Sequence, residues 1–500
     1  MDLTLLVALP VILPLLFGAV SLVMLNNHNV QRWLGAIGTA SILIAACALL
    51  WQCREQGILV LEVGSWPAPF GIVLVADLLA AIMVLLAAIT GFATALYSLK
   101  TVRKRFERFG YYPLLHLLLA GVNGAFLTGD IFNLYVWFEV LLVASFALLI
   151  QGGERAQMEG AIKYVTLNLL SSALFLTAIG LLYGLVGSLN MADIAQRLTQ
   201  VEDQGMVTVV AMLFLIAFSI KAAAFPLFFW LPASYHTPQV AVSAIFAGLL
   251  TKVGVYALYR VFTLIFNAEV EFTHNILLWM AVLTMLTGVL GAAAQFEVRR
   301  ILSFHIISQI GYMMLGLALY TPLALIGGVF YIMHHIIVKA NLFLVAGLIY
   351  RLRGSFELKR LGGLYKDHPG LAVLFLIPAL SLAGVPPLSG FFAKFILIKA
   401  GVEVHAWWAV GIALLVGLLT LYSMIKIWNE AFWKAVPEPA PAIPAPGRNG
   451  LLYWITGSLA AMTIAIGIFA EPIYQLAQQA AAQLLNPQLY INAVLGADSL

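Results

Sequence analysis

Charged residues are scarce in this sequence. Asp, Glu, Lys and Arg together make up 10% of its 500 residues, whereas hydrophobic residues make up 63%. A soluble globular domain carries about 25% charged residues, so a water-soluble fold could not cover this much apolar surface. The scarcity of charge therefore excludes an ordinary soluble protein. A nucleic-acid-binding protein is also excluded, because the net charge of +4 is spread over short segments between apolar stretches and forms no basic domain.

Cysteine is equally scarce, with Cys47 and Cys53 the only two in the chain. Two thiols cannot assemble a four-thiolate cluster, and their surroundings offer no zinc-ligand spacing. Phosphate-cradling loops, nucleophile elbows and metal motifs are missing from the sequence as well. We therefore expect no metal and no cofactor, and neither ATP-driven transport nor hydrolysis is indicated.

Long apolar stretches, in contrast, recur from one end of the chain to the other. Their length of about 18 to 30 residues is what a helix needs to cross about 30 Å of hydrocarbon. The first stretch follows Asp2 without a basic segment and shows no small-residue cleavage pattern, so we expect a span there rather than a secretory signal. The sequence predicts an all-α polytopic membrane protein with about 14 transmembrane helices. The predicted spans lie near residues 4–25, 34–51, 74–98, 111–128, 131–150, 162–184, 206–232, 239–263, 275–295, 300–320, 324–350, 371–400, 406–428 and 451–470.

The spans suggest an internal organisation with two inverted five-helix repeats. Each repeat contains one span interrupted by proline, within KAAAFPLFFWLP from Lys221 and within GVPPLSGFFAKF from Gly384. Broken helices at corresponding positions of two inverted repeats indicate a transporter's ion path. The expected divisions are an N-terminal three-helix segment at 1–110, the first repeat at 111–266, the second repeat at 274–430, a Pro-rich cytoplasmic linker at 431–450, the last transmembrane helix at 451–470 and an outer-side C-terminal tail at 471–500.

The distribution of basic residues predicts the orientation in the membrane. Lys and Arg gather in one set of alternate loops, for example 100–108 and 351–366, while the opposite set holds little beyond Arg54 and Arg197. Basic residues in short loops mark the cytoplasmic side. We therefore expect a multi-pass protein of the bacterial inner membrane with both termini on the outer, periplasmic side.

Two segments near the C-terminus are predicted to lie outside the spans. The sequence PEPAPAIPAP, from Pro437 to Pro446, favours an extended polyproline linker. The tail after Glu471 is rich in Ala, Gln and Leu, which suits an amphipathic helix on the outer surface or against a partner. A frayed tail is the alternative.

Five ionisable residues lie deep inside apolar sequence: Glu139, Lys221, Lys252, Lys339 and Lys394. A charge at membrane depth costs roughly 2.5 to 3.5 kcal/mol, so it needs a partner or a function. For Glu139 alone, a structural pair with one lysine is the alternative. One carboxylate cannot neutralise four lysines, so some are expected to be neutral amines that exchange protons. Two like charges about 8 Å apart repel by roughly 2 kcal/mol at an effective dielectric near 20, so protonating one lysine could expel a proton from its neighbour.

Two histidines are candidates for the same hydrated path. His305 is spaced with Ser308 and Gln309 so that polar groups surround a helix interior, and His335 lies four residues before Lys339 on one helical face. The other histidines differ in their expected roles. His334 is predicted to face elsewhere, His116 to pack in an apolar span, and His236 to be either a proton entrance or part of a solvated loop.

The motifs around these residues resemble the antiporter-like membrane subunits shared by Mrp-type cation/proton antiporters and respiratory complex I. The resemblance covers nearly all of the chain up to about Glu471. It rests on HLLLAGVNGAFLTGDIFNLYVWFEVLL around Glu139, KAAAFPLFFWLPASYHTPQVAVSAIFAGLLTKVGVYALYR around Lys221 and Lys252, RRILSFHIISQIGYMMLG around His305, HHIIVKANLFLVAG around Lys339, and PLSGFFAKF around Lys394. Within that superfamily, NLYVWFEV, ASYHTPQVAVSA and FHIISQIG are similar to the D-type subunits of Mrp, also named Mnh or Pha, complexes.

The resemblance implies roles for individual residues. The equivalent of Glu139 pairs with that of Lys221, and those of Lys252, Lys339 and Lys394 continue a hydrated axis along the membrane midplane. It also implies a proton-translocating subunit of a Na⁺(K⁺)/H⁺ antiporter, working with A, B, C, E, F and G types of subunit. The alternatives are a proton-pumping membrane subunit of complex I or of a membrane-bound hydrogenase, and a stand-alone solute carrier.

Overall fold

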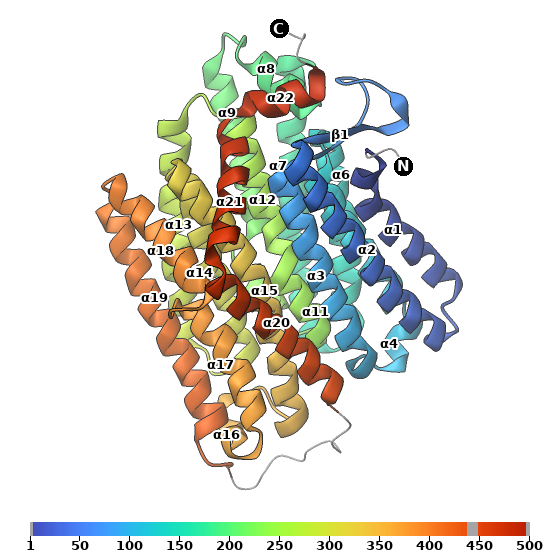
Figure 1. Ribbon diagram of the computed structural model, residues 1–500, viewed down its shortest axis with the longest axis vertical. Helices are drawn as coiled ribbons and strands as arrows, with labels where there is room; N and C mark the ends of the chain where they lie inside the picture. Colours follow the sequence, from blue (N-terminus) through green and yellow to red (C-terminus); the bar gives the residue numbers. More distant parts are fainter. Residues whose placement is uncertain (1–3, 438–448, 497–500) are drawn as a thin grey trace.

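A computed structural model describes residues 4–437 and 449–496 as a bundle of roughly parallel helices (Figure 1). Within these residues, 12 helices are long and apolar enough to cross a membrane. Two shorter apolar helices, α5 (Tyr111–Leu127) and α17 (Pro369–Ala383), occupy two further predicted spans. The prediction of an all-α polytopic membrane protein is confirmed. The Pro-rich linker predicted up to Pro446 falls, apart from Pro437, outside the described residues.

The N-terminal part contains three long helices and one feature that the sequence pattern did not indicate. A small antiparallel hairpin pairs Leu59 with Ala76 in the loop between the second and third helices. The elements are α1 (Leu5–Val23), α2 (His28–Gln56), β1 (Leu59–Glu62), η1 (Val63–Ser65), β2 (Val73–Ala76), α3 (Leu78–Thr101) and α4 (Lys104–Arg108).

The next two groups of helices lie within the residues assigned to the two predicted repeats. After α5, the first group contains α6 (Ile131–Ile150), α7 (Arg155–Val186), α8 (Met191–Leu198), α9 (Gln204–Ala222), α10 (Trp230–Ser234), α11 (Val240–Ile245), the π-helical turn η2 (Phe246–Leu250) and α12 (Thr251–Leu264). The second group contains α13 (Val270–Ala294), α14 (Val298–Ala318), α15 (Pro322–Arg353), η3 (Leu358–Arg360), α16 (Leu364–Asp367), α17, α18 (Ser389–Glu403), α19 (Trp407–Ile427) and η4 (Trp428–Trp433).

Both predicted helix breaks are present. Helix α9 ends where Ala223 adopts a φ of 60°, and the chain becomes helical again only at α10. Helix α17 ends where Gly384 adopts a φ of 94°, and α18 begins at Ser389. A left-handed residue at the end of a helix turns the chain away from the axis, so each break exposes backbone carbonyls to neighbouring side chains. The inverted relation of the two repeats stays a prediction.

Helix α15 lies at the centre of the bundle (Figure 1). Its best span window is 100% buried, because α3, α14, α17, α18, α20 (Gly450–Ile468) and α21 (Ala470–Leu485) all pack against it. Small residues allow the closest approaches, as in membrane helix pairs generally. A Cβ added to Gly316 of α14 would lie 2.7 Å from the Cα of Gly328 of α15. Side chains along the buried window of α15 are therefore enclosed by protein on all sides.

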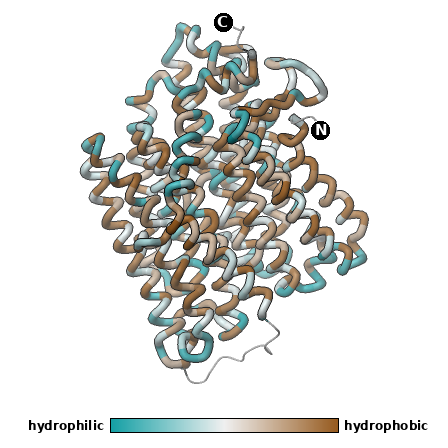
Figure 2. The backbone as a smooth tube through the Cα atoms, in the orientation of Figure 1, coloured by the Kyte–Doolittle hydropathy of each residue, from teal (hydrophilic) through white to brown (hydrophobic). Residues whose placement is uncertain are grey.

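Hydrophilic residues gather at the two ends of the bundle, and the middle is hydrophobic (Figure 2). Helix α1 begins and α22 (Pro487–Leu495) ends toward the same, upper end, whereas α4 and α16 lie at the lower end (Figure 1). The residues after Glu471 form α21 and α22, which pack against α15, α3 and α8 of this chain. The tail is therefore helical rather than frayed as far as the described residues reach.

Candidate proton-transfer site

Glu139 and Lys221 are connected through a serine. Ser172 of α7 donates a short hydrogen bond to Oε1 of Glu139 on α6, and Nζ of Lys221 on α9 lies 3.0 Å from the Ser172 hydroxyl oxygen. Lys221 also donates to the backbone oxygen of Asn168 at 3.3 Å and lies 5.3 Å from the centre of the Phe138 ring. Among the described residues, no direct ion pair joins Glu139 to Lys221. Ser172 is thus the shared partner of the acid and the amine.

Lys252 is fully buried and lies two residues after the end of the π-helical turn η2. Its Nζ donates to the backbone oxygen of Ala247, inside that turn, at 2.5 Å. Single π-helical turns disturb the regular backbone hydrogen bonds and are frequent at functional sites. The α12 helix also approaches α9 closely, because a Cβ on Gly254 would lie 2.8 Å from the carbonyl carbon of Lys221. The two lysine-bearing helices are therefore in direct contact.

Three predicted residues come together between α14 and α15. Lys339, His335 and His305 are all fully buried. Nζ of Lys339 donates to the backbone oxygen of Leu302 at 3.0 Å, which ties it to α14 one turn before His305. His335 lies within electrostatic range of Lys252, Lys339 and His305. The structure thus brings these groups into one cluster, whereas the sequence spacing predicted only that His335 and Lys339 share a helical face.

Lys394 lies at the second helix break. Its Nζ donates to the backbone oxygen of Ala383, the last residue of α17, at 3.0 Å and sits 5.0 Å from the centre of the Tyr312 ring. The freed carbonyl at the break therefore holds the lysine, much as the Ala247 carbonyl holds Lys252. His305 of α14 lies within electrostatic range of Lys394.

A second polar group at this break is not apparent from the sequence. The helical spacing predicts that His334 faces elsewhere, but its Nδ1 lies 2.8 Å from the hydroxyl of Ser389, which lies 3.0 Å from the hydroxyl of Ser381. His334 is also within electrostatic range of Lys394. No sequence pattern marks the serines, since single serines are common in apolar helices. The pairing of His334 with a broken span depends on the tertiary structure.

Taken together, the basic groups form a row across the bundle. The groups of the row lie on α6, α9, α12, α15, α14 and α18; in Figure 1, α6 is right of centre, α18 is on the left, and α12 and α15 lie between them. Consecutive groups from Lys252 to Lys394 are electrostatic neighbours. Lys426 of α19 is a further neighbour of His305 that the sequence analysis did not include; its Nζ donates to the backbone oxygens of Ala293 and Gln295 at 2.7 Å each.

Several fully buried polar atoms along this row lack a protein hydrogen-bond partner in the described part of the chain. They include both ring nitrogens of His305 and His335, the hydroxyl of Ser308 and both side-chain atoms of Asn341. Buried polar groups are rarely left unsatisfied, and ordered water is the usual partner where protein is not. The row therefore has the donors and acceptors of a hydrated path.

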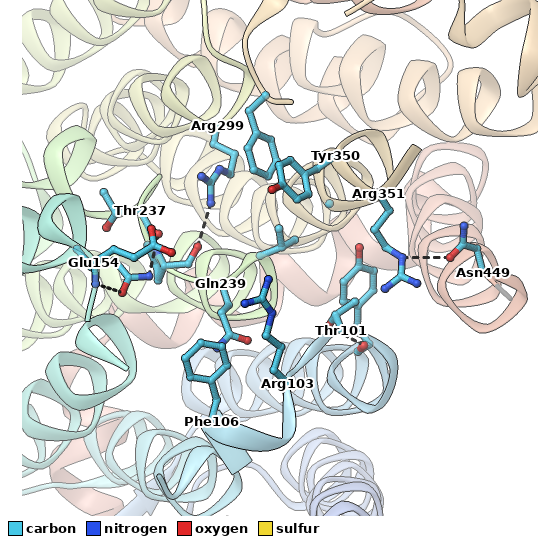
Figure 3. Close-up of a pocket in the computed structure, with 16 residues that line it drawn as sticks. Thr101, Arg103, Phe106, Glu154, Thr237, Gln239, Arg299, Tyr350, Arg351 and Asn449 are labelled. Carbon is cyan, nitrogen blue, oxygen red and sulfur yellow. Dashed lines mark hydrogen bonds between the residues drawn. The ribbon is translucent and has the colours of Figure 1, made fainter. Parts of the chain in front are cut away.

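A cavity of about 490 Å³ opens at the lower end of the bundle, between α3, α7, α11, α14 and α15. Figure 3 shows Arg103, Arg299 and Arg351 reaching into it from three different elements. Gln239 lines the cavity just before α11, and the helix continues from there to Lys252.

The helix between the cavity and Lys252 carries further polar groups. Gln239, Ser243 and Thr251 each have a buried polar atom without a protein partner among the described residues. Gln239 and Ser243 are four residues apart and so share one helical face, and Thr251 directly precedes Lys252. Polar atoms that could bind water thus follow this helix from the cavity toward the lysine.

His236 lies near the same end, outside the spans. Its Nε2 accepts a hydrogen bond from Nε of Arg300 at 3.2 Å, and its Nδ1 lies 2.8 Å from the backbone oxygen of Pro232. Burial and the positive charges of Arg300 and Arg299 lower the pKa of His236 to about 4. The ring is therefore neutral near pH 7, which favours a structural role over a proton entrance.

A buried ion pair joins the upper end of α12 to the start of α3. Nη2 of Arg260 lies 2.6 Å from Oδ2 of Asp77, and both side chains are almost fully buried. Asp77 also accepts from the Ala80 amide at 2.8 Å and so caps α3. The Arg260 guanidinium lies between the rings of Tyr256 and Tyr490, at 5.4 and 5.0 Å. Tyr490 connects this pair to the C-terminal helix α22.

Residues 128–420, which include every residue of the row up to Lys394, match the model of the NADH:quinone oxidoreductase/Mrp antiporter transmembrane family. The match covers more than half of the chain. The chain belongs to this family. Curated members match over almost their whole length. The D-type subunit of the Na⁺/H⁺ antiporter of Alkalihalophilus pseudofirmus is 48% identical over 98% of this chain and 99% of its own, and that of Bacillus subtilis is 41% identical over 98% and 99%.

Solved structures agree with this family membership. A chain of the Mrp complex from Dietzia sp. DQ12-45-1b superposes with a TM-score of 0.92 at 33% identity, covering 99% of this chain and 100% of that one. A chain of respiratory complex I from Thermus thermophilus superposes with a TM-score of 0.81 at 26% identity, covering 96% and 99%. The chain is thus a D-type subunit of the Mrp kind within the complex I-like antiporter superfamily. The resemblance seen in the sequence motifs is confirmed.

Proposed function

We propose that this chain is the proton-translocating subunit of a multisubunit Na⁺(K⁺)/H⁺ antiporter. The observation that carries the proposal is a row of buried basic groups that interact with one another from Lys252 to Lys394, next to a helix on which Lys221 shares Ser172 with the carboxylate of Glu139. The proposed relay consists of Glu139, Lys221, Lys252, His335, Lys339, His305 and Lys394. D-type subunits of Na⁺/H⁺ antiporters match nearly the full length of the chain, which supports this assignment over a complex I or hydrogenase subunit.

The relay works by repulsion between neighbouring cations. Lys252 and Lys339 share one buried cluster, and among residues 4–437 and 449–496 no carboxylate is an electrostatic neighbour of that cluster. When one of them takes up a proton, the like charge favours proton release from the other. Water along the unpaired atoms of His305 and His335 carries the proton between them. Each transfer changes the electrostatic repulsion on the next group in the row. A proton that enters at one end therefore promotes release of a proton at the other end.

Glu139 and Lys221 form the end of the relay with a switchable contact. While Ser172 bridges the carboxylate and the amine, the positive form of Lys221 is favoured. Movement of α6 relative to α7 would break the bridge and favour proton loss from Lys221. The helix break after α9 gives this segment a backbone that can shift without disturbing the regular helices around it.

We further propose an orientation and a proton entrance. The lower end of the bundle carries Arg103, Arg299 and Arg351, and basic loops face the cytoplasm. In the proposed orientation, both termini lie on the outer side of a bacterial cell membrane. The cavity at that end, with Gln239 and Thr251 on the helix leading to Lys252, is the proposed cytoplasmic entrance.

The proposed partners are the A, B, C, E, F and G types of subunit. Glu139 is the only acid of the row, and a single carboxylate is a poor site for Na⁺ or K⁺, which prefer several oxygen ligands. The cation route therefore lies wholly or partly in other subunits. The chain alone should not exchange cations for protons.

The test measures cation-dependent pH change in everted vesicles that contain the whole complex, with Glu139 intact or replaced by Ala. We expect the Glu139→Ala complex to assemble and to lose exchange. Normal exchange by that variant would contradict the relay. In a second arm, the purified chain is reconstituted in liposomes under a Na⁺ or K⁺ gradient. Robust exchange there would contradict the multisubunit assignment and favour a stand-alone carrier.

A further inference from the structure

Helix α21 presents a polar face at a depth where the other helices present apolar residues. Its exposed side chains include Glu471, Gln475, Gln478 and Gln479. In Figure 2 the helix stands out as a hydrophilic run along the front of the bundle, between hydrophobic neighbours. The opposite face is made of Ala477, Ala480, Ala481 and Leu484, which are buried against the bundle. The polarity of the exposed face needs an explanation, because hydrocarbon cannot hydrogen-bond to it.

Two contacts fix the depth of α21. One turn before it, Gly467 packs so closely on the second helix break that an added Cβ would lie 2.9 Å from the Cα of Leu388. That break holds Lys394, a member of the central row. Near the other end of α21, Oε1 of Gln483 accepts a hydrogen bond from the backbone amide of Leu78 at 2.9 Å, at the upper start of α3. Helix α21 therefore runs from the middle of the bundle to its upper end.

The polar residues lie in the deeper part of this path. At 1.5 Å per residue, the ten residues from Ala470 to Gln479 cover about 15 Å, which is about half of a 30 Å hydrocarbon core. Glu471 is thus near the midplane, and Gln479 is near the upper boundary of the hydrocarbon. A carboxylate facing lipid near the midplane costs several kcal/mol.

The hydrogen-bonding capacity of this face is only partly used within the chain. Nε2 of Gln475 donates to Oε1 of Glu471 at 2.9 Å. Gln478 and Gln479 have no protein hydrogen-bond partner in the part of the chain that the structure describes. Glutamine side chains that face outward from a membrane helix commonly hydrogen-bond to another helix. Water and lipid headgroups are available at the upper end of α21 but not around Glu471.

We infer that the polar face of α21 is an interface for a neighbouring membrane subunit of the same complex. The partner chemistry follows from the face: a transmembrane helix that offers hydrogen-bond donors, such as Ser, Thr, Asn or Lys, at the level of Glu471 and the glutamines. The inference rests on the proposed function for the existence of other subunits. It adds which surface of this chain they cover.

The test uses the intact purified complex with cysteines placed on α21. Cys47, the exposed native cysteine, is first replaced by Ala to remove background labelling. Gln479→Cys is then labelled with a small maleimide in the assembled complex and in the dissociated chain, both in detergent. We expect at least a ten-fold slower labelling in the complex. Equal labelling in the two states would overturn the inference. Ala480→Cys, on the buried face, serves as the control that stays unlabelled in both.

A second measurement, co-purification of the other subunits, distinguishes whether a partner subunit or lipid covers the polar face of α21. The variant Gln478→Leu/Gln479→Leu makes the face apolar and suits lipid better, whereas Gln488→Leu changes an exposed glutamine on α22 as the matched control. If another subunit covers α21, the double variant co-purifies with less than about half of the partner subunits retained by the control. Unchanged retention overturns the inference. Failure of the unaltered chain to co-purify with any subunit would instead contradict the proposed function.

Discussion

Replacing Ser172 by Ala tests the link between the carboxylate and the lysine most directly. The substitution removes one hydroxyl, which donates to Glu139 and lies 3.0 Å from Nζ of Lys221. A hydrogen bond to a charged group contributes about 1.5–3 kcal/mol. Since each 1.36 kcal/mol changes a rate tenfold, losing one such bond should slow cation-dependent proton exchange by roughly 10- to 150-fold. Water that replaces the hydroxyl would bring the effect to the lower part of this range.

The neighbouring serine provides a matched control. Ser171 is buried on the same helix and donates to the backbone oxygen of Ala217 on α9 at 2.7 Å, but it touches neither Glu139 nor Lys221. Exchange is measured in everted vesicles with equal amounts of assembled complex. Ser171→Ala should retain the unaltered rate within about twofold, and Ser172→Thr, which keeps the hydroxyl, should recover most of it. An assembled Ser172→Ala complex that exchanges at the unaltered rate would refute the bridge.

Three further substitutions test other parts of the structure. Lys394→Glu should reduce exchange at least ten-fold because it reverses a charge of the row, while Lys394→Arg should leave assembly unchanged; unaltered exchange by the Glu variant would remove Lys394 from the path. Asp77→Ala should destabilise the complex by about 3–5 kcal/mol, because it leaves Arg260 buried and unpaired, and the lower midpoint of thermal unfolding should partly recover in Asp77→Ala/Arg260→Ala. His236→Gln should leave the pH profile of exchange unchanged between about pH 6 and 9, since the pKa of about 4 keeps the ring neutral there. A shifted exchange profile in the variant would restore His236 as a proton entrance. The pKa of His236 in the folded protein is also below the ordinary 6.5. The unaltered complex should therefore lose stability relative to His236→Gln as the pH falls from about 6.5 toward 4.

The candidate site was only partly predictable from the sequence. Glu139 and the four lysines were recognisable because each interrupts a long apolar run, and the cost of a buried charge makes such interruptions informative. Ser172 gave no such signal, because a serine in a membrane helix can satisfy its hydroxyl on the preceding turn of its own backbone. Its role as a bridge depends on how α6, α7 and α9 are rotated about their axes.

The same distinction applies to the helix that carries the central groups. The spacing of His335 and Lys339 correctly places them on one face of α15, since residues four apart are neighbours on any helix. His334 is predicted to face elsewhere on this helix, and the spacing alone gives no partner for it. The central part of α15 is surrounded by other helices. His334 therefore contacts a polar partner on a different side of α15, Ser389 at the second helix break.

The sequence by itself determined the class of fold, the approximate spans, the two broken helices and the depth at which charges are buried. These properties are local, because they depend on the hydropathy and backbone preferences of consecutive residues. Only the tertiary structure decided which buried groups share a partner, that Tyr490 of the C-terminal helix lies against Arg260, and that α21 turns Gln475, Gln478 and Gln479 outward while Gln483 accepts from the Leu78 amide. Those features depend on the rotation and tilt of helices that are far apart in the chain. The packing of the whole bundle determines this rotation and tilt, so no local sequence pattern can reveal them.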